Sequence, residues 1–272
     1  MEQKWEVFND IKAYLKGRGL HCDYYRDAYL ERRLVVRLKK CGKTSFADYL
    51  SHLRSDPAEC QKLTDCLLVN VSSFFRDGTP FENLQRNIFP RLSRRAAQEG
   101  RRALRVWSAA CATGEEPYSI AMSAHEAIPD FFARGDKLKI VASDIDEESL
   151  KSARRGEYPA KTMQGVEDRL LRKYFSRKGA SYAVMDFIRE SVHFVKNDLI
   201  GDMPPWQGLD LILCRNMLIY IHLRMQEHIL GKLWGALGAG GVLILGKSEV
   251  LPGSLAEKFE EVSPQDGIYF KR

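Results

Sequence analysis

The residues best suited to chemistry lie in a short segment of small side chains and carboxylates. Residues 108–117 (SAACATGEEP) follow an apolar, strand-like run at 104–110 and include Glu115 and Glu116. Small residues let a ligand approach the backbone, and the start of the next helix offers unpaired N–H groups. The segment is neither a GxGxxG fingerprint nor a P-loop, and its carboxylates favour a ligand with ammonium or hydroxyl groups over a polyphosphate. A plain strand-to-helix turn is the competing interpretation.

Asp144 is a second candidate, because it ends the apolar run 138–142 (LKIVA). In doubly wound sheets, an acid at this position accepts hydrogen bonds from ribose hydroxyls. Capping of the next helix by Asp144 or Asp146 is the alternative. A Rossmann dehydrogenase is a rival function, but the weak glycine fingerprint disfavours it.

Two further segments combine polar and aromatic residues. Residues 214–220 (CRNMLIY) emerge from the apolar run 209–214, and residues 70–77 (NVSSFFRD) lie between the two halves of the chain. Polar groups at the carboxyl end of a buried strand usually face a ligand. Loop capping by Asn216, core packing by Tyr220 and an Arg76–Asp77 pair at a domain seam are the structural alternatives.

Two kinds of predicted structure position these segments: helices in the first third of the chain, and alternating strands and helices after it. Residues 1 to about 90 repeat apolar side chains at helical spacing, whereas strand-like runs at 104–110, 138–142, 192–195, 209–214 and 241–245 are separated by helical stretches. This alternation predicts an α/β fold with a parallel, doubly wound sheet and an antiparallel strand at 267–270. Ligands then bind beyond the carboxyl ends of the strands. Residues 155–191 are too long for a plain connection and predict an inserted subdomain.

Composition restricts the class of protein. The 272 residues are 44% hydrophobic and 29% charged, no apolar run approaches the ~20 residues of a membrane span, and residues 1–10 contain no signal core. We therefore expect a cytoplasmic protein with no membrane insertion. The six cysteines form no CxxC pair and no histidine stands at ligand spacing from them, so we expect reduced thiols and no metal site.

Four segments, taken in order, resemble the CheR-type methyltransferases that methylate glutamates of bacterial chemoreceptors. They are NVSSFFRD, WSAACATGEEPYSIAM, ASDID and CRNMLIY. The resemblance implies an all-helical N-terminal domain before a Rossmann-like methyltransferase sheet with a small inserted β-subdomain. It implies S-adenosyl-L-methionine as methyl donor, S-adenosyl-L-homocysteine as product, and the helical cytoplasmic bundle of a methyl-accepting chemoreceptor as substrate. In some family members the β-subdomain also binds a receptor C-terminal tail peptide, and the sequence leaves open whether it does so here. The expected domains are 1–75 (helical), 76–100 (linking helix and boundary) and 101–272 (methyltransferase, with the subdomain at about 157–191).

Carried over position by position, the resemblance implies a set of cofactor contacts. Ser72 stands where the family more often has threonine, and Asp198 stands where an apolar residue is common, so a contact at Asp198 would use the backbone. Either Glu115 or Glu116 faces the cofactor, and we favour Glu115. The expected cofactor-binding residues are Asn70, Ser72, Arg76, Glu115, Asp144, Asn197, Asp198, Arg215 and Asn216.

The implied reaction needs little acid–base machinery. A glutamate with a pKa of about 4.3 is already ionised near neutrality, and the six histidines are scattered along the chain. Catalysis should rest on proximity, orientation and desolvation. We expect Tyr220 to position the acceptor carboxylate, helped by Arg91 or Arg94 of the linking helix.

Charge suggests how the substrate is recognised. Residues 1–95 hold 18 Lys and Arg against 12 Asp and Glu, whereas the remainder holds 24 of each, so the net charge of +6 belongs to the N-terminal third. On a helix over about 25–40, one row of cations would face acidic receptor helices, although such a row is usually a solvated face. The row consists of Arg26, Arg33, Arg37 and Lys40.

Two other functions fit the same fold. A nucleic-acid methylase would suit the positive charge, but the expected (N/D)PP(Y/F) motif is replaced by CRNMLIY. A non-catalytic S-adenosylmethionine-binding module is the second alternative, which the intact motifs disfavour. We expect a monomeric protein-glutamate O-methyltransferase that does not bind nucleic acid.

Overall fold

A computed structural model describes residues 2–18, 22–67 and 71–272. The chain forms two compact units. The first contains residues 1–69 together with 220–225, and the second contains residues 70–219 together with 226–272.

The first unit is all-helical, as the sequence predicts. Leu34 and Leu53 lie in its apolar core. Ser45 caps the third helix by accepting a hydrogen bond from the Asp48 N–H (3.1 Å), and Pro57 starts the fourth. Residues 220–225 join this unit through hydrogen bonds such as Arg26 N–H to the Tyr220 carbonyl (2.9 Å). The helices are α1 (Glu2–Lys16), η1 (Cys22–Tyr24), α2 (Asp27–Lys40), α3 (Phe46–Ser55) and α4 (Pro57–Leu67).

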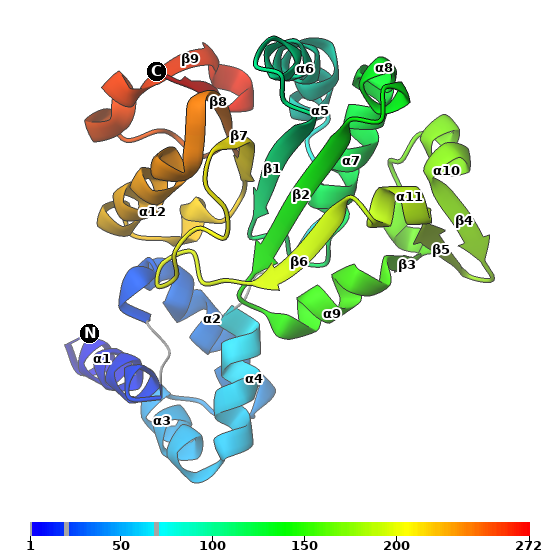
Figure 1. The fold of residues 1–272 in the computed structure, drawn as a ribbon. Helices are drawn as coiled ribbons and strands as arrows, with labels where there is room; N and C mark the ends of the chain where they lie inside the picture. Colours follow the sequence, from blue (N-terminus) through cyan, green and yellow to red (C-terminus); the bar gives the residue numbers. More distant parts are fainter. Residues whose placement is uncertain (1, 19–21, 68–70) are drawn as a thin grey trace. The chain divides into compact units, whose positions relative to one another are not determined.

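A seven-stranded sheet forms the centre of the second unit (Figure 1), in the order β6-β2-β1-β7-β8-β10-β9. The five strands from β6 to β8 are parallel, and β10 is antiparallel to both β8 and β9. The α/β fold is therefore confirmed, although β9 was not predicted because its two glutamates interrupt the apolar pattern. The strands are β1 (Ala103–Ala109), β2 (Lys137–Asp144), β6 (Val192–Lys196), β7 (Leu209–Cys214), β8 (Leu237–Leu245), β9 (Phe259–Ser263) and β10 (Ile268–Lys271).

Both faces of the sheet are covered. Consecutive residues Leu211, Ile212 and Leu213 are fully buried, which requires packing on both sides because successive side chains of a strand point to opposite faces. The helices are α5 (Thr79–Asn83), a π-helical turn η2 (Leu84–Ile88), α6 (Phe89–Gln98), α7 (Glu115–Ala127), α8 (Pro129–Ala133), α9 (Glu147–Arg155) and α12 (Leu223–Ala236), with short turns η4 (Leu218–Tyr220), η5 (Gly253–Lys258) and η6 (Pro264–Asp266).

A small antiparallel sheet lies between α9 and β6 along the chain, in the order β3-β5-β4. Its α10 helix is tied to α7, since Glu126 accepts hydrogen bonds from Lys173 (2.6 Å) and Tyr174 (2.5 Å) and pairs with Arg169. The elements are β3 (Glu157–Pro159), η3 (Ala160–Met163), α10 (Asp168–Tyr174), β4 (Phe175–Lys178), β5 (Ser181–Val184) and α11 (Asp186–Arg189).

Within the described ranges, every helix is too short or too polar to cross a lipid bilayer.

Candidate cofactor site

The loops that carry the sequence motifs meet at one edge of the large sheet. Ala109 at the end of β1 pairs with Ser143 of β2 on one side and with Cys214 of β7 on the other. All three strands are parallel, so the loops that follow them leave the same edge. In Figure 1, α9 lies at this edge, whereas α6 and α8 lie at the opposite end of the strands.

Asp144 connects two of these loops through hydrogen bonds. Its carboxylate is largely buried and accepts hydrogen bonds from the N–H groups of Ala112 (2.8 Å) and Asp146 (3.0 Å). Burial raises the pKa of Asp144 although these hydrogen bonds oppose the shift. Asp146, rather than Asp144, caps α9 by accepting from the Glu148 N–H (3.0 Å). A carboxylate has about four acceptor sites, so Asp144 retains capacity for a ligand.

The two neighbouring glutamates face different surroundings. Glu115 accepts from the Thr113 hydroxyl (2.8 Å) and interacts with the Ser72 side chain, and burial raises its pKa. Glu116 instead accepts from Ser108 (2.8 Å) and lies 3.6 Å from Arg215. Glu115 thus shares a location with another expected cofactor residue, whereas Glu116 is committed to contacts beneath the loop.

Arg215 differs from the sequence expectation. Its side chain is only 1% exposed and donates to Asp77 (2.7 Å) and to the Arg76 carbonyl (3.0 Å). The guanidinium is therefore enclosed by protein, and it holds the turn at residues 76–77 against the end of β7. Any cofactor contact at this position would involve the backbone. Sequence spacing could not reveal this role, because Asp77 lies 138 residues away.

The loop after β6 contains an acceptor that lacks a partner. Asn197 is largely buried and donates from Nδ2 to the Met203 carbonyl (3.0 Å), but its Oδ1 atom has no hydrogen-bond partner among the described residues. Asp198 uses its carboxylate to accept from the Ile200 N–H (2.9 Å), so its side chain is occupied in a turn. Its backbone N–H donates to Asp202 (2.8 Å).

Strained backbone is concentrated in the same loops. Within the part of the chain that the structure describes, the non-glycine residues with positive φ all belong to the segments 70–77, 108–117 and 214–220. Such conformations cost of order 1–3 kcal/mol each and cluster at functional sites. The five residues are Phe75 (φ 51°), Asp77 (70°), Ala110 (61°), Ala112 (47°) and Asn216 (60°).

Glu249 is an organising residue that the sequence analysis missed. Its buried carboxylate accepts from the N–H groups of Gly246 (2.7 Å), Asn216 (2.9 Å) and Ile219 (3.3 Å). A Cβ atom on Gly246 would lie 2.8 Å from this carboxylate and 2.8 Å from the Asn216 nitrogen, so the close approach requires glycine. An acid four residues after the last apolar strand position, Leu245, was the available signal.

The remaining cofactor candidates are less enclosed. Arg76 is partly exposed and donates to the Val71 carbonyl (2.9 Å). Asn70 lies outside the described residues.

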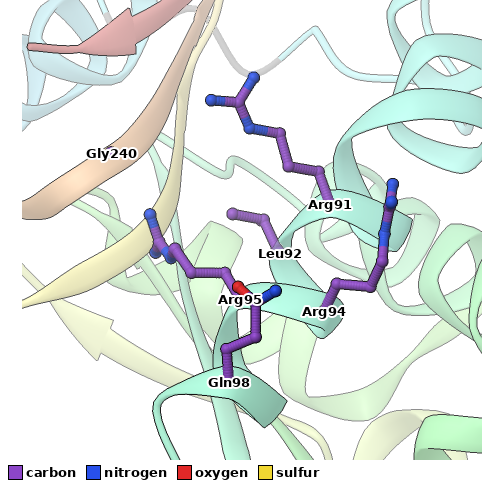
Figure 2. A pocket seen from close by; sticks show the side chains of 6 residues that line it. All are labelled: Arg91, Leu92, Arg94, Arg95, Gln98 and Gly240. Atoms are coloured by element: carbon purple, nitrogen blue, oxygen red, sulfur yellow. The ribbon is translucent and has the colours of Figure 1, made fainter.

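Two of the expected catalytic residues, Arg91 and Arg94, lie away from the motif loops of the second unit. Arg91 and Arg94 line a cavity of about 430 Å³ with Leu92, Arg95, Gln98 and Gly240 (Figure 2). Arg95 donates to Asp210 (2.6 Å) and to the Ala239 carbonyl (2.8 Å), near the starts of β7 and β8. This cavity is therefore at the amino ends of the strands, away from the motif loops.

Tyr220 packs in the first unit. The centroids of the Tyr220 and Tyr29 rings are 4.6 Å apart. The ring of Tyr220 therefore has a packing role in addition to the catalytic role expected of its hydroxyl.

The expected basic row on α2 is only partly a row of solvated cations. Arg37 turns inward, with a side chain 13% exposed, and donates two hydrogen bonds to the buried Glu59 (2.9 and 2.6 Å). Its charge is therefore neutralised, contrary to the expectation for a substrate-facing residue. Arg33 lies over the Tyr29 ring (5.3 Å), Arg26 donates to the Ile221 carbonyl (3.2 Å), and Lys40 is exposed.

Comparison with known proteins defines the class. Residues 70–268 match the CheR methyltransferase S-adenosylmethionine-binding domain, and residues 6–68 match the CheR all-alpha domain. The chain belongs to the CheR methyltransferase family, and it is an S-adenosylmethionine-dependent methyltransferase of chemotaxis.

Three curated relatives extend over most of the chain. A chemotaxis protein methyltransferase of Listeria monocytogenes is 34% identical over 232 residues, covering 85% of this chain and 84% of the relative. Chemotaxis protein methyltransferase 1 of Pseudomonas aeruginosa is 32% identical over 269 residues and 97% of both chains. Chemotaxis protein methyltransferase 2 of the same organism is 37% identical over 222 residues, covering 80% and 76%.

The motif loops suit this cofactor. S-adenosylmethionine presents donor groups in its ammonium, ribose hydroxyls and adenine amine, and the loops present acceptors in Glu115, Asp144 and the unpaired Oδ1 of Asn197. The chemical character of the donor set therefore agrees with a cationic, hydroxyl-rich ligand and not with a polyphosphate.

Proposed function

We propose that this enzyme transfers a methyl group from S-adenosylmethionine to glutamate side-chain carboxylates of bacterial chemoreceptors, forming methyl esters. Membership of the family and the printed names of the relatives support a chemotaxis substrate. The observation that carries the proposal is the linked set of acceptors and strained loops at the carboxyl edge of the sheet.

The proposal assigns a role to each of these side chains. Asp144 accepts from the ribose hydroxyls, Asn197 Oδ1 accepts from the adenine amine, and Glu115 pairs with the ammonium group of the cofactor. Ser72 and Asn216 line the same site together with Arg76 and the backbone at Arg215. At Asp198 the contact uses the backbone carbonyl, because the Asp198 N–H already donates to Asp202. Asn70 belongs to the proposed set through the family motif alone.

The chemistry requires orientation more than proton transfer. The bound cofactor supplies a methyl group activated on a sulfonium. An acceptor glutamate is ionised at neutral pH, so it attacks the methyl carbon directly and no general base has to remove a proton. The residues of this chain hold the two reactants in line and exclude water, and effective molarities from such positioning are large. Tyr220 orients the acceptor carboxylate through its hydroxyl.

Substrate recognition is electrostatic in this proposal. Arg33 and Lys40 of α2, and Arg26 just before it, remain as cations that can face acidic receptor helices, whereas Arg37 is paired internally. The edge strand β4 pairs only with β5 among the described residues, and a receptor tail peptide could extend such an edge by β-augmentation. The enzyme acts as a monomer in the cytoplasm, where the receptor bundle lies.

One assay tests the proposal. The full chain is incubated with methyl-labelled S-adenosylmethionine and either a receptor cytoplasmic fragment, the same fragment with its glutamates changed to glutamine, or RNA. We expect base-labile label on the first substrate alone. Label on RNA would favour the nucleic-acid methylase, and cofactor binding without transfer to any substrate would favour the non-catalytic module.

A further inference from the structure

A cluster of metal-binding side chains lies within the first unit, apart from the cofactor residues. Cys41 caps the end of α2, His52 lies in α3 and Glu59 lies in the first turns of α4. One ligand atom from each side chain, the thiol sulfur, an imidazole nitrogen and a carboxylate oxygen, lies within 4.8 Å of the other two. The sequence predicted no metal site, because these residues stand 11 and 7 positions apart, with Cys41 just after α2 and the other two on α3 and α4.

The separation is close to that of a tetrahedral zinc site. Zn–S bonds of about 2.3 Å and Zn–N or Zn–O bonds of about 2.0–2.2 Å place ligand atoms roughly 3.3–3.6 Å apart. From separations of up to 4.8 Å, a contraction of up to roughly 1.2–1.5 Å is needed, and side-chain rotation can supply it because Cys41 and His52 are only half-buried. Their partial exposure also leaves room for metal entry and for water as a fourth ligand.

Glu59 is held in position by residues that would form the outer shell of such a site. Its carboxylate is 1% exposed and accepts from Arg37 (2.9 and 2.6 Å) and from the Tyr49 hydroxyl (2.8 Å). Outer partners of this kind fix the orientation of a ligand before metal arrives. The Cys41 thiol also hydrogen-bonds this carboxylate, and loss of the thiol proton on metal binding frees that acceptor site for the metal.

The charges around these three side chains determine how tightly they can bind Zn²⁺. A thiolate and a carboxylate neutralise Zn²⁺, but the Arg37 guanidinium remains close, with its Nη2 atom 3.9 Å from the Cys41 sulfur. This cation repels the metal. Burial and the neighbouring Glu59 carboxylate raise the pKa of the Cys41 thiol although Arg37 opposes them, so zinc must itself displace the thiol proton. These opposing charges favour moderate, reversible zinc binding and disfavour a permanently bound structural zinc.

We propose that Cys41, His52 and Glu59 bind one Zn²⁺ ion between the ends of α2, α3 and α4, with water as the fourth ligand. The Cys41 S–H bond breaks, the proton passes to solvent, and the thiolate sulfur forms the bond to zinc. No oxidation change occurs. The site does not depend on the methyl-transfer function, so its test uses metal binding as the readout.

The test titrates the purified, reduced full chain with Zn²⁺ against a chromophoric chelator, and with Co²⁺ in an absorption experiment. We expect one metal per chain and a thiolate-to-cobalt charge-transfer band. Cys41→Ser and His52→Gln should each weaken zinc binding by more than about tenfold. The matched controls Cys66→Ser and His228→Gln should bind as the wild type does.

Two results would overturn the proposal. One is the absence of a thiolate–cobalt band in the wild-type chain. The other is equal loss of binding in Cys66→Ser and Cys41→Ser. Circular dichroism and S-adenosylmethionine affinity are measured for each variant, so that a misfolded protein is recognised, and the wild-type stoichiometry decides the question if a variant does not fold.

Discussion

At the scale of single residues, the adjacent glutamates Glu115 and Glu116 have different surroundings and different expected roles. Glu115 lies with Thr113 and Ser72 at the proposed cofactor site, whereas Glu116 accepts a hydrogen bond from Ser108 and lies near Arg215. A helix turns by about 100° per residue, so neighbours necessarily face different directions.

We predict that Glu115→Gln weakens S-adenosylmethionine binding by about tenfold with little change in stability, because an interaction with the ligand ammonium is worth roughly 1–2 kcal/mol. Glu116→Gln should instead lower the free energy of unfolding, since it disturbs a buried contact to Arg215. Calorimetric titration and thermal unfolding of both variants give the comparison. The reverse pattern would assign the cofactor contact to Glu116.

The Tyr220 hydroxyl can be tested without disturbing the packing of its ring. Tyr220→Phe keeps the contact with Tyr29, so we expect unchanged cofactor affinity and melting temperature. Methyl transfer to a receptor fragment should fall by roughly tenfold or more if the hydroxyl orients the acceptor. Wild-type turnover in this variant would remove Tyr220 from the mechanism.

At the scale of elements, the loop after β7 depends on an acid from the segment after β8. Glu249→Ala would leave the N–H groups of Gly246, Asn216 and Ile219 without their acceptor. We expect a loss of at least about 2 kcal/mol in unfolding free energy and weaker cofactor binding. The exposed Glu257→Ala is the control. Retained affinity together with lowered stability would show that the loop geometry is fixed without this acid.

The attachment of α10 to α7 should depend on acid pH. Burial disfavours ionised Glu126, but hydrogen bonds from Lys173, Tyr174 and Arg169 outweigh it and lower the pKa from 4.5 to about 2. The ionised carboxylate therefore stabilises the folded state above pH 4.5, and this contribution disappears as the pH falls from 4.5 to 2. Since both cations are about half exposed, we expect only about 1–2 kcal/mol.

Denaturant unfolding of the wild type and Glu126→Gln between pH 3 and pH 7 measures this effect. The difference in stability between the two proteins should be largest at neutral pH and shrink on acidification. A difference that does not change with pH would contradict the assigned role.

At the scale of the whole molecule, the positive charge belongs to the helical third of the chain and the chemistry to the sheet. Charge reversal at Arg33 and Lys40 should weaken receptor binding, increasingly so at low salt, because exposed charges steer association. Cofactor affinity should not change, since the cofactor residues lie in the other unit. Binding of receptor fragments and of S-adenosylmethionine is measured in parallel. Loss of both would indicate misfolding.

The sequence by itself determined most of the succession of elements, the edge of the sheet at which the site is proposed, and the family. These properties depend on local pattern: helical spacing of leucines, the Ser45 cap, Pro57 at a helix start, and Asp144 at a strand end. Apolar periodicity and capping act within a few residues, so they can be read without knowing the fold.

Only the tertiary structure decided which of these side chains face a ligand. Arg215 turns to Asp77, Arg37 turns to Glu59, and Glu249 supports Asn216, and these partners lie 138, 22 and 33 residues apart. The three candidate zinc ligands likewise come from separate helices. An ion pair or hydrogen bond forms only where two polar groups are brought within about 3 Å, and for groups far apart in the chain the packing of the helices and the sheet controls that approach.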